Sequence, residues 1–178
     1  MDLLGAVGSE LTLTRTDSAN TPKSLGKKIL YLDMDNVLVD FVTGIERLEP
    51  AVQAEYQGRL DEVPGIFALM DPVPGAVEAF HELSQIFDTY LLSTAPWLNP
   101  SAWSDKVEWV HKHLGVENSA AVHKRLILSH HKNLNVGDFL VDDRSKNGAE
   151  QFTGEWIQYG KAPFETWDDV VPYLVDRA

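Results

Sequence analysis

The sequence predicts an α/β fold built on a mainly parallel sheet of about five strands. Three observations lead to this prediction. Short apolar runs at 28–33, 88–93, 125–129, 139–141 and 155–159 have the length and composition of strands that are buried in a sheet. Stretches with apolar residues at helical spacing separate these runs. Strands that alternate with helices are typical of parallel sheets joined by right-handed crossover connections.

The composition limits the class of protein. The chain has 178 residues, enough for one domain with a substantial core. Its net charge of −12 argues against a nucleic-acid polymer as partner, because no basic stripe could displace counterions from phosphates. The chain has no cysteine, which excludes disulfides and thiolate metal sites. No apolar run could span a bilayer and no signal peptide is evident, so we expect a cytoplasmic protein without membrane contact.

The chain divides into an extension and a core domain. Residues 1–26 end in a linker-like stretch and are expected to be a weakly structured extension, whereas 27–178 should form the core domain. After the first strand, residues 37 to about 60 have helical spacing of apolar residues that is interrupted at Pro50. The sequence therefore predicts a small helical insertion, which would act as a cap, at about 41–72.

The helices of the core are predicted from their spacing and from their end signals. Apolar residues of 75–87 share one helical face. A second helix should start at Ser101 as its cap and run to about Leu114, with Gly115 as its stop. A closing helix is expected at 166–175.

Polar side chains fall at the carboxyl ends of three predicted strands and in one short loop. In an open α/β sheet these ends converge on one crevice, which is where ligands bind. The residues in question are Asp33, Asp35, Thr94, Lys132, Asp142 and Asp143.

This group of residues points to phosphoryl chemistry that depends on a cation. Two acids as close as Asp33 and Asp35 repel each other unless a cation lies between them, and Mg²⁺ prefers such hard oxygen ligands. The hydroxyl of Thr94 and the ammonium of Lys132 could hold a phosphoryl group. One carboxylate could then act as nucleophile while another transfers protons. Each of these residues also has an ordinary structural explanation. The acids could form a turn, Thr94 or the pair Asp142 and Asp143 could cap helices, and Lys132 could be a surface lysine.

In order and spacing, these residues resemble the four motifs of the haloacid dehalogenase (HAD) superfamily of phosphohydrolases. Longer stretches resemble the 5'(3')-deoxyribonucleotidase family more closely still. The resemblance covers roughly 28–175 and implies a HAD-like Rossmannoid sheet with a cap inserted after the first strand. It also implies a Mg²⁺ cofactor, a small-molecule phosphomonoester as substrate, and a chain that often pairs as a homodimer. The stretches are Asp33-Met-Asp35-Asn-Val-Leu-Val-Asp-Phe41, 74–79, Ser93-Thr-Ala-Pro96, 108–110 and 137–144.

The resemblance implies a role for each acidic residue. Asp33 would be the nucleophile and a ligand of the metal. Asp35 would be the general acid and base, and its backbone carbonyl would also bind the metal. Asp143 would be the third protein ligand, and Asp142 would support these ligands from behind.

The phosphate-binding residues follow in the same way. Thr94 and the amide of Ala95 would bind phosphate, and Lys132 would neutralise it and orient Asp33. The family usually has serine after the motif threonine, so Ala95 removes one hydroxyl from the site. The insertion is also shorter than in eukaryotic members. Phe41 is the one residue that matches the family's substrate pocket, although core packing is an equal alternative for it.

The predicted substrate is a (deoxy)nucleoside monophosphate, and three alternatives remain open. A HAD phosphatase for a non-nucleotide phosphoester, such as a sugar phosphate, would use the same residues. A signalling receiver domain also uses acids, Mg²⁺, threonine and lysine, but its adjacent acids follow the first strand and its phosphorylated aspartate follows a later one. A binding protein without turnover is the third alternative, and every catalytic position here is filled.

Several further residues are assigned to the pocket, to the core or to the surface from their place in the sequence. Phe67 and Met70 are candidates for the pocket that no alignment supports. We interpret Trp97, Trp103 and Trp109 as packing residues, and His130 and His131 as solvent-exposed. Lys106 could reach the mouth of the site, and Arg144 should pair with a nearby acid.

Overall fold

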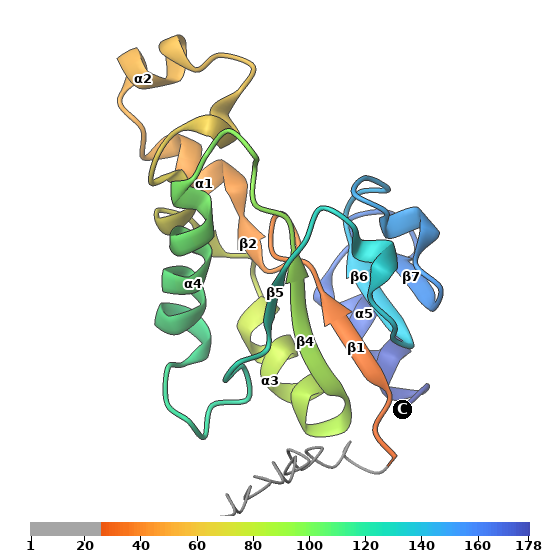
Figure 1. The fold of residues 1–178 in the computed structure, drawn as a ribbon. Helices are drawn as coiled ribbons and strands as arrows, with labels where there is room; N and C mark the ends of the chain where they lie inside the picture. Colours follow the sequence, from red (N-terminus) through yellow and green to blue (C-terminus); the bar gives the residue numbers. More distant parts are fainter. Residues whose placement is uncertain (1–25) are drawn as a thin grey trace, which may run out of the picture.

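The computed structural model describes residues 26–178 and contains a five-stranded sheet (Figure 1). The strand order is β5-β4-β1-β6-β7, and all four neighbouring pairs are parallel. The predicted α/β class and parallel sheet are confirmed, and each strand lies within one residue of its predicted ends. The predicted extension, apart from Gly26, lies outside the described residues. The strands are β1 (Ile29–Leu32), β4 (Asp88–Ser93), β5 (Leu126–Leu128), β6 (Phe139–Asp142) and β7 (Glu155–Gln158).

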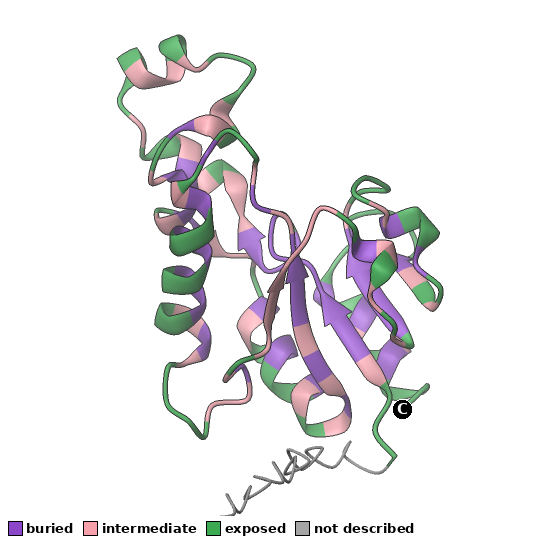
Figure 2. Ribbon diagram, in the orientation of Figure 1, coloured by how far each residue is buried: buried purple, intermediate pink, exposed green. Residues whose placement is uncertain are grey.

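The three long helices pack on one face of the sheet. They are α3 (Ala76–Ile86), α4 (Ser101–Leu114) and α5 (Trp167–Val175). Alternate residues of a strand point to opposite faces, so Leu30 and Leu32 join the core under these helices. Tyr31 lies in a smaller cluster on the other face, which is packed by the loops around β6. Figure 2 shows the central strands buried along most of their length.

The helices begin and end where local chemistry requires it. In α5, the Thr166 amide donates to the Asp169 carboxylate at 2.9 Å, which satisfies a free donor at the helix start. The prediction that Ser101 caps α4 was wrong by one residue, because Pro100 occupies the cap. Ser101 is instead the first helical residue, and its hydroxyl accepts the amide of Gly65 at 2.8 Å. This bond ties the insertion to α4.

The segment between β1 and α3 extends beyond the carboxyl ends of β1 and β4 (Figure 1). The predicted helix from residue 37 was wrong at its start. The amides of Leu38 and Val39 both donate to the carbonyl of Met34, which makes a tight turn. Asp40 then caps α1 by accepting the Val42 amide. The segment contains β2 (Val39–Asp40), α1 (Phe41–Glu46), α2 (Pro50–Glu55), η1 (Leu60–Glu62), η2 (Ile66–Ala68) and β3 (Asp71–Pro72), with β2 antiparallel to β3.

Two loops on the other side of the sheet carry short 3-10 helices, η3 (Lys132–Leu134) and η4 (Ala149–Gln151). The Lys132 amide donates to the carbonyl of Asn147 at 2.7 Å and so joins these two loops. No helix among residues 26–178 has the length and apolar character needed to cross a membrane.

Candidate active site

The two acids of the first motif lie directly after β1, at the centre of the sheet. The Asp33 amide continues the ladder by donating to the carbonyl of Val141 at 2.9 Å. Its carboxylate is held locally, because the Met34 amide donates to Asp33 Oδ1 at 2.8 Å. Asp33 and Asp35 are 3% and 8% exposed. Asn36 takes a left-handed φ of +57° in the turn that follows. The turn therefore presents two buried carboxylates at one strand end.

Lys132 lies against these acids from the loop after β5. The residue is 2% exposed. Its Nζ lies 3.0 Å from Asp33 Oδ2 and also donates to Asp142 Oδ2. Burial acts to lower the pKa of Lys132, but the charges of Asp33 and Asp142 outweigh it and raise the pKa above its ordinary value. The ammonium therefore stays charged beside the candidate nucleophile.

The carboxylates of Asp33, Asp142 and Asp143 form an acidic cluster, with one oxygen of each within 4.8 Å of the others. Both oxygens of Asp142 are already engaged, Oδ2 by Lys132 and Oδ1 by the Arg144 amide at 3.0 Å. Asp143 Oδ1 is buried and accepts no hydrogen bond from residues 26–178, although Arg144 Nε lies 3.4 Å away as an ion pair. The free oxygens of this donor set suit a hard divalent cation.

The electrostatics of the cluster favour a bound cation. Burial, and then the charge of Asp33, raise the pKa of Asp142 to about 7, although Lys132 partly opposes them. Burial also raises the pKa of Asp143, against the opposing charge of Arg144. Acids whose charged forms are unfavourable would gain from a neighbouring divalent cation.

Thr94 and Ala95 lie where β4 ends beside β5. The Thr94 hydroxyl donates to the carbonyl of Ser129 at 2.8 Å, so it would have to rotate before it could donate to a phosphate oxygen. Ala95 is fully buried, and the group it could offer to an anion is its backbone amide. Thr94 lines the pocket, whereas Ala95 does not.

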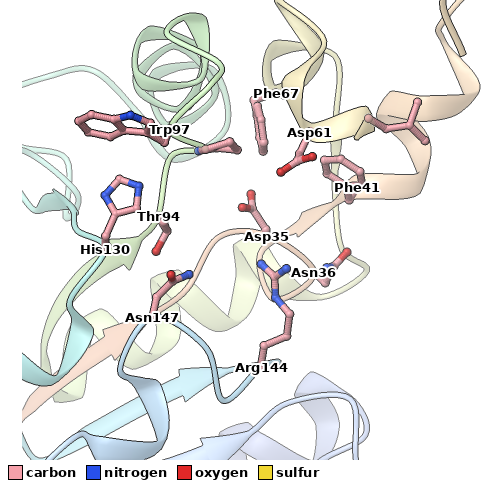
Figure 3. Close-up of a pocket in the computed structure, with 12 residues that line it drawn as sticks. Asp35, Asn36, Phe41, Asp61, Phe67, Thr94, Trp97, His130, Arg144 and Asn147 are labelled. Carbon is pink, nitrogen blue, oxygen red and sulfur yellow. The ribbon is translucent and has the colours of Figure 1, made fainter. Parts of the chain in front are cut away.

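A pocket of about 440 Å³ is lined by Asp35, Thr94 and Arg144, whereas Asp33 and Lys132 are not among its lining residues (Figure 3). One wall comes from the insertion and includes Phe41, Phe67 and Asp61, and Asp35 reaches the pocket from below. Phe41 and Phe67 both line this pocket, and Phe41 also packs against the hydrophobic core. Met70 is fully buried and does not line the pocket.

Two pocket residues were misassigned from the sequence. Trp97 is 80% exposed and lines the pocket, so interpreting it as a packing residue was wrong. His130 also lines the pocket, and its Nε2 is buried without a hydrogen-bond partner in the described part of the chain. The two rings contact each other at a centroid distance of 5.9 Å. Their nearness to motif residues in the sequence could have indicated this, since Trp97 lies three residues after Thr94 and His130 lies two residues before Lys132.

Lys106 is not at the mouth of the site. It is 1% exposed and lies behind Asp35, where its Nζ is 2.6 Å from Asp35 Oδ1. Burial raises the pKa of Asp35, and the charge of Lys106 opposes this rise. Arg144 pairs with Asp143, as the sequence predicted.

Comparison with known proteins gives the family. The model of a family described as "5' nucleotidase, deoxy (Pyrimidine), cytosolic type C protein" matches residues 47–166. A relative from Vibrio phage KVP40, named as a 5'(3')-deoxyribonucleotidase, is 54% identical over 155 residues, which are 87% of this chain and 89% of the relative. The chain belongs to the 5'(3')-deoxyribonucleotidase family. It is therefore a phosphomonoester hydrolase, and the receiver-domain alternative is excluded.

Two further proteins are similar to this chain at lower identity. The human cytosolic 5'(3')-deoxyribonucleotidase is 29% identical over 156 residues, which are 71% of this chain and 76% of the human one. A solved structure of a haloacid dehalogenase-like hydrolase from Burkholderia xenovorans has a TM-score of 0.48 and 14% identity, over 84% of this chain and 98% of that one. The resemblance that the sequence motifs predicted is confirmed by the family match.

Proposed function

We propose that this protein is a magnesium-dependent phosphatase that removes phosphate from (deoxy)nucleoside monophosphates through an aspartyl-phosphate. The observation that carries the proposal is the pairing of buried Lys132 with Asp33 at 3.0 Å, directly before Asp35, which lines the pocket. The names of the relatives add support, because both are named as 5'(3')-deoxyribonucleotidases. Residues 41–72 would act as the cap over this pocket.

The metal would be held by Asp33, Asp143 and the backbone carbonyl of Asp35. The buried Asp143 Oδ1, which accepts no hydrogen bond from the described residues, is the feature that fits a cation best. Asp142 would support the ligands, because both of its oxygens are taken by Lys132 and the Arg144 amide. When bound, Mg²⁺ would neutralise charge on the transferred phosphoryl group.

The first step transfers the phosphoryl group to the protein. A carboxylate oxygen of Asp33 attacks phosphorus in line with the ester bond, and a bond forms between that oxygen and phosphorus. The phosphorus–oxygen bond to the nucleoside breaks as Asp35 gives its proton to the leaving oxygen. Lys132, which lies 3.0 Å from Asp33 Oδ2, fixes the nucleophile and balances charge on the phosphoryl oxygens.

The second step regenerates the protein. Asp35, now a carboxylate, takes a proton from water while the water oxygen attacks phosphorus. The bond between phosphorus and Asp33 breaks, and inorganic phosphate leaves. Asp35 is protonated again and Asp33 is again a carboxylate. Burial raises the pKa of Asp35, which favours the protonated form that the first step needs.

The pocket would hold the nucleoside. Its volume of about 440 Å³ lies in the range of small-molecule sites. Aromatic side chains from two sides, Phe41 on the insertion and the exposed Trp97 on the core, give flat faces on which a base can stack. The phosphate would lie between Thr94, the Ala95 amide and Lys132.

A sugar phosphate is the second candidate substrate. The pocket wall opposite the insertion carries His130, Asn147 and Arg144, whose polar groups could pair with hydroxyl groups of a sugar. The buried Nε2 of His130 lacks a partner among the described residues, and a hydroxyl would give it one.

The test is release of inorganic phosphate from a panel of substrates, with magnesium and with EDTA. The panel contains 5'- and 3'-deoxynucleotides, ribonucleotides, sugar phosphates and p-nitrophenyl phosphate. We expect magnesium-dependent release that is fastest with a nucleotide. Release from sugar or aryl phosphates alone would refute the nucleotidase activity and leave the phosphatase.

A further inference from the structure

A buried lysine of α4 contacts the candidate acid and base of the site. Lys106 is 1% exposed, and its Nζ lies 2.6 Å from Asp35 Oδ1 and 3.2 Å from Ser93 Oγ. The remaining side of the ammonium faces the ring of Phe67, whose centroid is 4.6 Å away. The lysine therefore joins α4, the end of β4, the turn after β1 and the insertion at one point.

The two carboxylate oxygens of Asp35 have different surroundings. Among residues 26–178, Lys106 is the side chain that hydrogen-bonds this carboxylate, and it uses Oδ1. Oδ2 accepts no hydrogen bond from the same residues. The Asp35 side chain is 12% exposed and lines the pocket, where its carboxylate is visible in Figure 3. One oxygen is anchored from behind, and the other is left for the pocket.

A purely structural role would not account for this pair. A buried ion pair pays a desolvation cost that its attraction often fails to exceed, so an apolar pair of the same size would serve stability as well or better. Asp33, the neighbouring acid, repels the Asp35 carboxylate and would favour its rotation away from the site. The hydrogen bond from the Lys106 ammonium fixes Oδ1 at one position and so limits rotation of the carboxylate.

We propose that Lys106 is a positioning residue that holds Oδ1 of Asp35, so that Oδ2 faces first the leaving ester oxygen and then the attacking water. The inference rests on the proposed function, in which Asp35 transfers both protons. Phe67 contributes by closing the apolar side of the ammonium, which ties the geometry of Asp35 to the position of the insertion.

The test compares two leaving groups. A nucleoside leaves as an alcohol and needs a proton from Asp35, whereas p-nitrophenolate leaves without one. The first turnover is followed with enzyme in excess, so that release of the leaving group is separated from the later hydrolysis. The variants are Lys106→Met, the reference Asp35→Asn, and Lys112→Met as a control at an exposed position of the same helix.

In Lys106→Met we expect release of the nucleoside to slow about 100-fold, which is the lower end of a general-acid contribution. Release of p-nitrophenol should change less than about 3-fold, within the effect of a lost neutral hydrogen bond. Asp35→Asn should show the same pattern, and Lys112→Met should match the wild-type protein. Equal slowing of both leaving groups in Lys106→Met, or slowing of neither, would overturn the inference.

A second variant covers the case in which Lys106→Met fails to fold. Ser93→Ala removes one acceptor of the ammonium with a small change of volume, and should slow nucleoside release about 3- to 10-fold, the size of one hydrogen bond. Equal effects of Ser93→Ala on both leaving groups would also overturn the inference. If the wild-type protein turned over neither substrate, the proposed function would fall and the inference with it.

Discussion

Replacing Lys132 by methionine would remove the charge that holds the candidate nucleophile. Methionine has a similar length and an apolar end, so the variant leaves no large cavity and changes mainly the charge. In the protein, the Lys132 ammonium lies 3.0 Å from Asp33 and also contacts Asp142, and the residue is 2% exposed. The variant would therefore leave two buried carboxylates without their common partner.

The expected loss is large relative to the stability of a domain. Removing one partner of a buried ion pair costs about 3–5 kcal/mol. A domain is stable by about 5–15 kcal/mol, so Lys132→Met should lose roughly a third of its free energy of unfolding. The carboxylates can escape part of this cost by binding protons. Because the pKa of Asp142 is already raised to about 7 and would rise further without Lys132, the deficit should be largest above pH 7 and should shrink as the pH falls.

The assay is urea unfolding in EDTA at pH 8 and pH 5, with Lys112→Met as the exposed control. We expect the free energy of unfolding of Lys132→Met to be about 3–5 kcal/mol below that of the wild-type protein at pH 8, and the difference to be clearly smaller at pH 5. Magnesium should restore more stability to Lys132→Met than to the wild-type protein, because it supplies positive charge to the same carboxylates. An unchanged stability at pH 8, or the same deficit at both pH values, would refute the reasoning.

Three further predictions test separate parts of the site and fold. Burial and the neighbouring Asp33 carboxylate raise the pKa of Asp142 from 3.8 to about 7 in the folded protein. The stability that protonated Asp142 contributes is therefore present below pH 3.8 and is lost as the pH rises through about 7. In EDTA, Asp142→Asn should flatten the fall of Tm between these two pH values, and an unchanged slope would contradict the assignment. Trp97 is 80% exposed, so Trp97→Ala should cost less than about 0.5 kcal/mol in urea unfolding. The same variant should raise KM for nucleotides about 10-fold through lost stacking and leave KM for sugar phosphates unchanged; equal values of KM for nucleotides would exclude a contact with the base. A Cβ on Gly154 would lie 2.4 Å from the backbone oxygen of Gly137, whereas a Cβ on Gly44 would meet the side chain of Met70 at 2.8 Å, which can move. Gly154→Ala should therefore lower Tm more than Gly44→Ala, and the reverse order would count against this packing.

The sheet and the acidic cluster could be predicted because their signals are local. A buried strand is a short apolar run, and Asp33 and Asp142 directly follow or end such runs, so their meeting at one edge follows from the parallel order of the strands. Asp142 and Asp143 are adjacent in the sequence, but the structure distinguishes them, because Lys132 and the Arg144 amide occupy both oxygens of Asp142.

The remaining features depend on contacts between distant segments. The start of α1 was wrong because residues 37–40 form a turn around the Met34 carbonyl and a short strand that pairs with β3. Lys106 has the spacing of an ordinary helical lysine, and its contact with Asp35 depends on how α4 packs against the turn after β1. The pocket positions of Trp97 and His130 depend in the same way on the loops after β4 and β5.

The central claim is that Asp33 becomes covalently phosphorylated. The most direct measurement uses Asp35→Asn with p-nitrophenyl phosphate, whose leaving group needs no proton, so that the first step stays fast while the second is slow and the intermediate accumulates. The variant is mixed with this substrate in magnesium, quenched in acid and treated with borohydride, which converts an aspartyl-phosphate to homoserine. We predict homoserine at residue 33 by mass spectrometry of the digested chain, and none in a variant that also carries Asp33→Asn. Hydrolysis of substrate without modification of residue 33, or modification of another aspartate, would contradict the account.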